Sequence, residues 1–187
     1  MNITLCNVKG GVGKSTLAVL LAYALAESGK RIALLDLDPQ GTARKWLKEY
    51  DDSKVTEYEP GQDYDAVFID TPPRLEALPA ALASCSVALI VCSPSPADLW
   101  TTQTTAAAIR PHLPKGARLR LLFNAVLHHS VLARDLPALA ERIGVKALVA
   151  TISRRQCYQH SALLGWRALD TAAREEIFKA ALEVIKA

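Results

Sequence analysis

The stretch NVKGGVGKST at residues 7–16 constrains the fold of this chain more than any other part of the sequence. It follows the apolar run ITLC and leads into the apolar stretch LAVLLAYALA, which is the order expected for a strand, a glycine-rich loop and a helix. In such a loop, successive backbone N–H groups and the N-terminal end of the helix face one anion. The sequence therefore predicts a phosphate-binding loop within an α/β fold.

The rest of the chain continues the alternation of strand and helix. Apolar runs of four to eight residues are mostly followed by turn residues and helical patterns, and these runs are ITLC, RIALLDL, DAVFID, SVALIVC, LRLLFNAV and VKALVA. Strands that alternate with helices pair in parallel, and near-continuously apolar strands are covered by helices on both faces. We expect a doubly wound, mostly parallel sheet of the P-loop NTPase type, formed by a single domain over residues 1–187.

The helices expected from the same pattern lie at residues 15–28, 42–49, 75–84, 97–110, 131–142 and 172–186, with a short basic helix near 154–162. The acidic stretch 49–65 is expected to form an exposed excursion with one short strand at KVTEY. In the last helix, Ile177, Ala181 and Val184 share one side, which predicts that the helix packs against the body of the domain.

Composition excludes several classes of protein. Of the 187 residues, 50% are hydrophobic and 22% are charged, and no apolar stretch is long enough to span a bilayer. The four cysteines form no Cys-x-x-Cys pair, which argues against a metal-cluster protein. The N-terminus carries no basic leader, so we expect a cytoplasmic protein.

Residues 110–167 hold 10 Lys and Arg against 2 Asp and Glu, a balance that favours an anionic partner.

Three residues at the end of the glycine-rich loop have the chemistry of a nucleotide site. Gly13 permits close approach of the backbone, Lys14 can reach the β- and γ-phosphates, and the Ser15 hydroxyl can ligate Mg²⁺. Val8 stands where the strict pattern G-x-x-x-x-G-K-[ST] has its first glycine. An additional lysine, Lys9, lies in the same loop.

Carboxylates follow two other predicted strands. Asp36 and Asp38 in LLDLDPQG point to the same side of a strand-like run, because side chains two residues apart share a face. Asp70 ends DAVFID, where open parallel sheets bind ligands, and it is expected to hold Mg²⁺ through a bound water. The alternative is that Asp70 caps the helix that follows.

Together these motifs resemble those of the ParA/MinD family of P-loop ATPases. The resemblance rests on K-G-G-x-G-K-[ST], D-x-D-P-Q-G and D-T-P-P, and the segments CSPSPADLW and TISRRQCYQHSALLGWRALD are most similar to the small, ParF-like ParA proteins. It implies a Mg²⁺-dependent ATPase that hydrolyses ATP to ADP and phosphate. It further implies that Lys9 crosses a nucleotide-sandwich dimer to the partner's phosphates, and that Asp38 orients the attacking water.

The resemblance also assigns ligand contacts. Asn124 would bond the adenine, and Ile152 and Ser153 would flank it. The implied nucleotide-binding residues are Lys9, Gly10, Gly11, Val12, Gly13, Lys14, Ser15, Thr16, Asn124, Ile152 and Ser153. The implied metal-binding residues are Ser15, Asp36 and Asp70, with Asp36 in the water shell, and the implied catalytic residues are Lys9, Lys14 and Asp38.

The function implied by the family is DNA partition. An ATP-bound homodimer, or a polymer built from such dimers, would bind nonspecific DNA, and a ParB- or ParG-like centromere-binding protein would stimulate hydrolysis. The protein would then be associated with the nucleoid. The candidate DNA contacts are Lys115, Arg118, Arg120, Arg154, Arg155 and Arg167. No helix-turn-helix domain is expected ahead of the ATPase motif.

Three alternatives stay open at this point. A membrane-surface regulator of the MinD type would end in a basic amphipathic helix, whereas the last predicted helix mixes acidic and basic residues. An electron-transfer ATPase would need cysteines placed to bridge a dimer axis. A positioning ATPase with another cargo, such as carboxysomes or chemoreceptor clusters, would share every motif described above.

Overall fold

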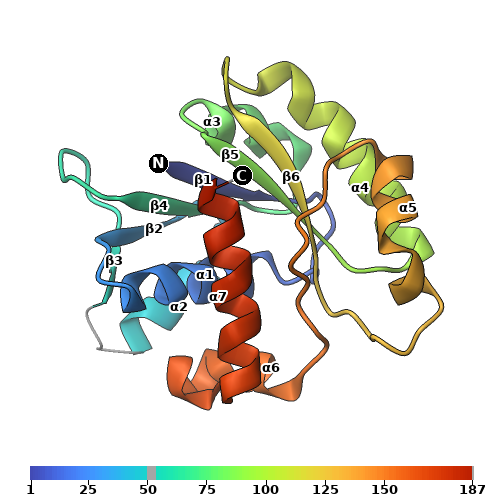
Figure 1. Cartoon of the computed structure of the whole chain (residues 1–187). Helices are drawn as coiled ribbons and strands as arrows, with labels where there is room; N and C mark the ends of the chain where they lie inside the picture. Colours follow the sequence, from blue (N-terminus) through green and yellow to red (C-terminus); the bar gives the residue numbers. More distant parts are fainter. Residues whose placement is uncertain (50–53, 187) are drawn as a thin grey trace.

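A six-stranded sheet forms the centre of the computed structural model, which describes residues 1–49 and 54–186 (Figure 1). The strand order is β3-β2-β4-β1-β5-β6, and every neighbouring pair is parallel. The strands are β1 (Asn2–Cys6), β2 (Ile32–Asp36), β3 (Val55–Glu57), β4 (Ala66–Asp70), β5 (Val87–Cys92) and β6 (Arg118–Phe123). The doubly wound parallel sheet predicted from the apolar runs is confirmed.

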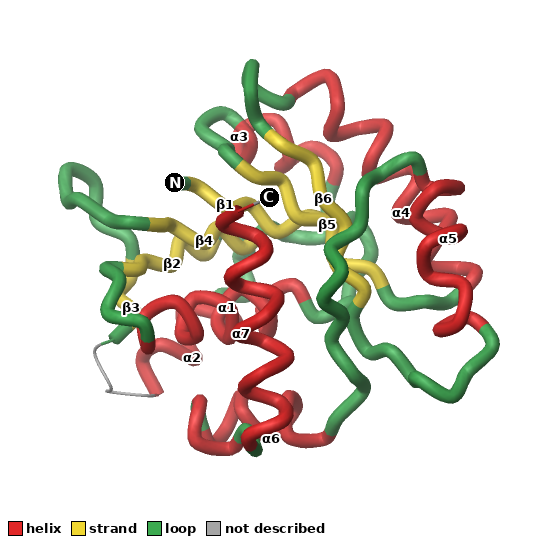
Figure 2. Tube along the Cα trace, in the orientation of Figure 1, coloured by secondary structure: helices red, strands yellow, loops and turns green. Residues whose placement is uncertain are grey.

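Helices cover both faces of the sheet, as Figure 2 shows. They are α1 (Lys14–Glu27), α2 (Thr42–Glu49), α3 (Leu78–Leu82), α4 (Pro96–Ile109), α5 (Leu136–Ile143), α6 (Gln156–Leu164) and α7 (Thr171–Lys186). One hydrophobic core joins α1, α2, α6 and α7 to the sheet, and a second core joins α3, α4 and α5 to the opposite face. The continuous apolar runs therefore match strands that are buried on both sides.

The carboxyl ends of three central strands lie at the same level. In the strand register, Leu5 of β1 and Asp36 of β2 are both paired with Asp70 of β4. Parallel sheets bind ligands at this edge, because the loops that leave the strands converge there. The fold therefore brings the glycine-rich loop and the acidic motifs to one place.

The apolar run at residues 145–150 is not a strand, so that prediction is wrong. The run forms a single isolated bridge, between Ala147 and Leu121 of β6. The Glu183 carboxylate on α7 then accepts hydrogen bonds from the backbone N–H groups of residues 149–150, at 2.7 and 2.9 Å. Because those amides are taken by a side chain, the ladder is interrupted, and pairing with β6 resumes only at Ile152, whose N–H donates to the Phe123 carbonyl at 2.9 Å.

Two predicted helices are shorter than expected, and prolines explain both differences. The stretch 75–84 forms a 3-10 turn followed by α3, and the stretch 131–142 forms a 3-10 turn followed by α5. Each of these α-helices carries a proline in its first turn, Pro79 or Pro137. Proline fits only the first turn of a helix, where its missing N–H costs nothing, so it sets the start.

The excursion predicted at residues 49–65 contains its expected strand, β3. Residues 50–53, which begin it, lie outside the described residues.

Helix α7 packs along α1, as predicted from its apolar face. Ile177, Ala181 and Val184 are fully buried in the core that α1 shares. Helix α1 is in turn buried almost all round, because it lies between the sheet and α7. Within the described part of the chain, no helix combines the length and the apolar character needed to cross a membrane.

Candidate functional site

The glycine-rich loop connects β1 to α1 through two left-handed residues. Gly11 and Gly13 have φ of +77° and +93°, a region that favours glycine. A Cβ atom on Gly13 would also collide with the side-chain amide nitrogen of Asn124. Gly13 is the N-cap of α1, and no side chain of the described residues bonds to the amides there. The start of α1 therefore offers its N–H groups and its dipole to an anion.

Lys14, the first residue of α1, lies inside this loop. Its side chain is largely buried, and its ammonium donates a hydrogen bond to the backbone oxygen of Lys9 at 3.3 Å. Burial lowers the pKa of Lys14, and the neighbouring carboxylates of Asp70 and Asp38 act in the opposite direction. The acidic motifs are therefore close enough to act on the Lys14 charge, as the sequence predicted.

Asp70 is a buried carboxylate with unfilled hydrogen-bonding capacity. It is 0% exposed, and neither side-chain oxygen has a hydrogen-bond partner of ordinary geometry among the described residues. Burial raises the pKa of Asp70 to about 6, although the Ser15 hydroxyl lowers it in part. Since its oxygens accept nothing from the following backbone, Asp70 does not cap a helix. A buried, unpartnered carboxylate beside a serine hydroxyl fits a hard cation such as Mg²⁺.

The protein side of this cation site is sparse. In the ranges 1–49 and 54–186, no group of three or more His, Cys, Asp or Glu side chains is arranged to hold a metal ion. Mg²⁺ usually keeps several waters and takes one or two carboxylates together with phosphate oxygens. Ser15 and Asp70 fit such a partial set, and waters and phosphate oxygens of the nucleotide would supply the remaining ligands.

Asp36 has a structural task that the sequence did not indicate. Its two oxygens accept hydrogen bonds from the backbone N–H groups of Asp38 and Arg44, both at 2.9 Å, and the Arg44 guanidinium bonds back to the Asp36 carbonyl at 3.1 Å. These bonds fix the turn between β2 and α2. The half-buried Asp38 lies on that turn, and its carboxylate accepts the N–H of Gln40 at 3.0 Å. The roles of Asp36 at the metal and of Asp38 at water stay predictions.

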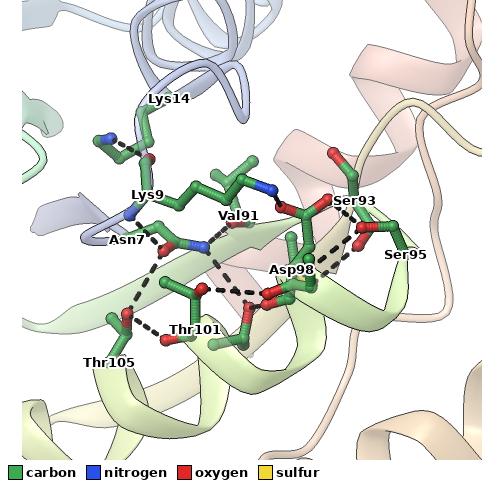
Figure 3. Close-up of polar contacts among 12 residues, drawn as sticks. Asn7, Lys9, Lys14, Val91, Ser93, Ser95, Asp98, Thr101 and Thr105 are labelled. Atoms are coloured by element: carbon green, nitrogen blue, oxygen red, sulfur yellow. Dashed lines mark hydrogen bonds and ion pairs between the residues drawn. The ribbon is translucent and has the colours of Figure 1, made fainter.

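Lys9 extends away from the loop and forms an ion pair with Asp98 on α4 (Figure 3). Asp98 is 7% exposed, and its other oxygen accepts the Ser95 hydroxyl at 2.5 Å. The Asp98 N–H donates to the same Ser95 oxygen, so this pair also caps α4. Sequence reasoning missed Asp98, although the S-x-x-D pattern of a helix start was a visible signal.

Asn7 fixes the first part of the loop and was also missed. It is fully buried, its amide nitrogen donates to the Val91 carbonyl of β5 at 2.8 Å, and its oxygen accepts from the Lys9 N–H at 2.9 Å and the Thr105 hydroxyl at 3.3 Å (Figure 3). The loop is thereby tied to β5 and α4. Lys9 is consequently held at both ends, its backbone by Asn7 and its ammonium by Asp98.

A cavity of about 210 Å³ lies beside the loop. Its wall includes Gly11, Gly13, Thr16, Asn124, Ser153 and Tyr158. Asn124 and Ser153 therefore meet at one cavity, as expected for residues around a base, and the Asn124 amide also donates to the Val12 carbonyl at 2.8 Å. Ile152, in contrast, is fully buried in the core, so its side chain does not face this space.

A larger cavity of about 620 Å³ lies between α5 and residues 144–149. It is mostly apolar and contains no residue of the three motifs. The smaller cavity is lined by residues of the glycine-rich loop and the start of α1, namely Gly11, Gly13 and Thr16, so we place the candidate site there.

The predicted DNA contacts do not form one uniform group. Lys115, Arg154 and Arg167 are exposed, whereas Arg118 and Arg120 are half-buried on β6. The Arg155 guanidinium is bound by the Glu176 carboxylate at 2.7 Å. Arg155 is therefore part of an internal ion pair, a fact that the count of basic residues could not reveal.

The chain is similar in sequence to known nucleotide-binding proteins. A sequence profile of the CobQ/CobB/MinD/ParA nucleotide binding domain matches residues 3–180. The Maintenance of carboxysome distribution protein A of Halothiobacillus neapolitanus is 30% identical over 191 residues, which cover 92% of this chain and 88% of that protein.

Two solved structures have the same fold. A candidate plasmid partition protein of Borrelia burgdorferi bound to AMPPNP has a TM-score of 0.78 at 18% identity, over 99% of this chain and 98% of that chain. The septum site-determining protein MinD of Pyrococcus horikoshii, complexed with Mg-ADP, has a TM-score of 0.73 at 18% identity, over 100% of this chain and 98% of that chain.

Proposed function

This chain belongs to the CobQ/CobB/MinD/ParA family of nucleotide-binding domains and is a positioning ATPase of the ParA/MinD type, and we propose that its ATP cycle drives the segregation of DNA. Its ligands are ATP and ADP, with Mg²⁺ as the cofactor. In the proposed cycle, ATP joins two copies of the chain, and the pair binds DNA without sequence preference. A centromere-binding partner protein then stimulates hydrolysis, which separates the copies and releases the DNA.

The contrast between the two loop lysines carries this proposal. Lys14 is buried in the loop near Asp70, whereas Lys9 extends outward and pairs with Asp98 (Figure 3). A lysine ammonium binds a phosphate oxygen as well as it binds a carboxylate, so Lys9 can exchange one anion for the other. We assign Lys14 to the phosphates of its own protomer and Lys9 to the phosphates of its partner.

The hydrolysis chemistry follows from positioning and charge, which dominate phosphoryl transfer. The backbone N–H groups at the start of α1 and the Lys14 ammonium hold the phosphates, and Asp38 orients the attacking water. Ser15 and Asp70 would hold Mg²⁺, which neutralises phosphate charge when it is bound. Asp36 would lie in the water shell of Mg²⁺, and its bonds to the turn also determine where Asp38 lies.

We propose that exposed lysine and arginine side chains bind the DNA. Residues 110–167 carry a large excess of positive charge, and Lys115, Arg154 and Arg167 are exposed within this range. Such contacts give sequence-independent affinity that falls as the salt concentration rises. For each phosphate neutralised, log K falls by about 0.9 per log unit of salt concentration. Two copies in one complex double the number of contacts, which explains why ATP would switch DNA binding on.

A DNA mobility shift tests the proposal directly. Labelled duplex DNA is incubated with the protein and either ATP, ADP or no nucleotide, at two salt concentrations. We expect a shift with ATP alone, weakened at the higher salt, lost in Lys14→Ala and retained in Asp38→Ala. A shift of equal strength under all three nucleotide conditions would show that ATP does not control DNA binding.

A second candidate cargo is the carboxysome, and the likeness to a carboxysome distribution protein favours it. The ATP cycle and the DNA surface would be the same, and only the partner would differ. A fluorescent fusion in the native cell separates the two candidates, because deletion of the true cargo's adaptor abolishes the dynamic pattern while deletion of the other leaves it intact.

Helix α7 is not placed to act as a membrane-binding helix. The apolar face of this helix is buried against α1, so it is covered and not free to enter a lipid surface. Sedimentation with anionic liposomes and ATP is expected to leave the protein in the supernatant, and ATP-dependent pelleting would favour the membrane role.

A further inference from the structure

We infer that Glu176, on the C-terminal helix α7, is a positioning residue for the nucleotide base. Its carboxylate fixes residues 153–158, the segment that walls the cavity beside the phosphate-binding loop. The inference rests on the proposed placement of the base in that cavity. None of the sequence motifs includes Glu176, which lies far along the chain from the loop.

Glu176 accepts five hydrogen bonds from three residues of this segment. Ser153 donates its backbone N–H at 3.0 Å and its hydroxyl at 2.7 Å. Arg155 donates two guanidinium N–H groups at 2.7 and 3.3 Å, and the Tyr158 hydroxyl donates at 2.9 Å. All three donor residues also line the 210 Å³ cavity. One carboxylate thus sets the position of three wall residues at once.

The charge of Glu176 is stabilised by these donors. Burial raises the pKa of Glu176, but the hydrogen bonds from Arg155, Ser153 and Tyr158 outweigh burial, and the net pKa is lowered. The side chain is therefore ionised at neutral pH and can only accept hydrogen bonds. Hydrogen bonds to a charged acceptor are stronger than neutral ones, so this network is rigid compared with an ordinary loop contact.

Ionised Glu176 also dictates how Ser153 bonds to its surroundings. The single hydroxyl proton of Ser153 must go to the carboxylate, because the carboxylate has no proton to give. The Ser153 oxygen then accepts from His128 Nε2 at 2.8 Å, which requires the His128 proton on that nitrogen. The Ser153 hydroxyl proton is consequently unavailable to a ligand, and the role of Ser153 is to shape the wall.

The location of Glu176 links the base to the phosphates. Its neighbours Ala173 and Ile177 on α7 are fully buried in the core shared with α1, and α1 begins at Lys14 in the phosphate-binding loop. The wall of the cavity and the phosphate-binding loop are therefore both held in place by the same pair of packed helices, α1 and α7. A ligand that spans both is bound most tightly when their separation is fixed.

The variant that tests this inference is Glu176→Gln, and Glu175→Gln is its matched control. Glu175 is the adjacent residue of α7, is exposed, and pairs only with Lys179 one turn away, at 3.6 Å, in the contacts of the described residues. The two substitutions remove the same charge from the same helix. Thermal unfolding of both proteins establishes that each is folded before binding is measured.

Two ligands separate a positioning role from a general loss of structure. Calorimetric titration with Mg-ADP engages the base and the phosphates, whereas titration with Mg-pyrophosphate engages the phosphate-binding loop alone. ADP lacks the γ-phosphate that the proposed dimer requires, so the values report on one protomer. We expect Glu176→Gln to weaken ADP binding about tenfold and to leave pyrophosphate binding within about twofold of wild type.

Other outcomes would overturn the inference. It is wrong if ADP affinity is the same in Glu176→Gln and Glu175→Gln, or if ADP and pyrophosphate are weakened equally. Should Glu176→Gln fail to fold, Ser153→Ala removes one donor and is expected to weaken ADP selectively as well. If wild-type protein bound ADP no more tightly than pyrophosphate, the placement of the base itself would be wrong, a failure distinct from that of Glu176.

Discussion

Replacing Asp98 by Asn is expected to strengthen the ATP-dependent dimer. In the wild-type chain, Lys9 must leave Asp98 before its ammonium can reach a partner's phosphates, and the departure leaves a carboxylate that is 7% exposed without its counter-charge. Asparagine has nearly the same volume and can still accept the Ser95 hydroxyl through its side-chain oxygen. The substitution therefore removes the ion pair while retaining the cap of α4.

The magnitude follows from the exposure of the two groups. The Asp98 side chain is 10% exposed and the Lys9 side chain is 40% exposed, so the pair lies between a buried and a surface ion pair. Surface pairs are worth about 0–1 kcal/mol and hydrogen bonds to charged groups about 1.5–3 kcal/mol. We take about 1–2 kcal/mol as the free energy of each pair. Because closing the dimer breaks one such pair in each of the two copies, the total is about 2–4 kcal/mol, or about 30- to 900-fold in the dimer dissociation constant.

Sedimentation velocity with a nonhydrolysable ATP analogue and Mg²⁺ measures this constant. The dissociation constant of Asp98→Asn is expected to fall by the factor above, whereas Lys9→Gln and the double variant dimerise poorly because neither has the lysine. An unchanged or weaker dimer in Asp98→Asn would refute the reasoning, since it would mean that Lys9 does not have to leave Asp98.

Three further substitutions test other parts of the structure. Gly13→Ala is expected to weaken ADP binding by about ten- to a hundredfold, because the left-handed backbone and the contact with Asn124 impose about 1–3 kcal/mol of strain. Calorimetric titration with ADP measures this change, and an unaltered affinity would contradict the strain argument. Asp70→Asn is expected to stabilise the nucleotide-free and metal-free protein at pH 7 by up to about 3 kcal/mol. The reason is that burial raises the pKa of Asp70 from 3.8 to about 6, so ionising this carboxylate destabilises the folded protein as the pH rises through this range. The stability gain should therefore fade as the pH falls toward 4 in chelator-containing buffer, and a gain that grew at low pH would contradict the raised pKa of Asp70. Ile177→Ala should lower the free energy of unfolding by about 2–5 kcal/mol in urea titrations, because this side chain is fully buried between α7 and α1.

The order of strands and helices was predictable because each element has a local signature. The run DAVFID became β4 and the pattern at 42–49 became α2 with the same bounds, since burial on both faces and amphipathic spacing are visible within a few residues. The stretch 145–150 was wrongly predicted as a strand, because its apolar composition is local but the Glu183 carboxylate that takes its amides comes from α7.

That the glycine-rich loop, Lys14 and Asp70 lie at one edge of the sheet was likewise predictable, because strand, loop and helix follow one another in the chain and the strands are parallel. The partners that hold these groups were not. Asn7 bonds to Thr105, Lys9 pairs with Asp98, and Glu176 gathers three donors of residues 153–158. Each of these contacts joins residues that are separated along the chain and meet only after the sheet and its helices have packed.

The sequence by itself thus determined the fold class and the type of ligand, because glycine spacing and apolar periodicity act over one or two adjacent elements. The tertiary structure alone decided that Lys9 is held by Asp98, that Arg155 pairs with Glu176, and that Asp36 fixes the turn before α2. The physical reason is that an acidic or basic side chain has many candidate partners in the sequence, and only close packing with low solvent access selects one of them.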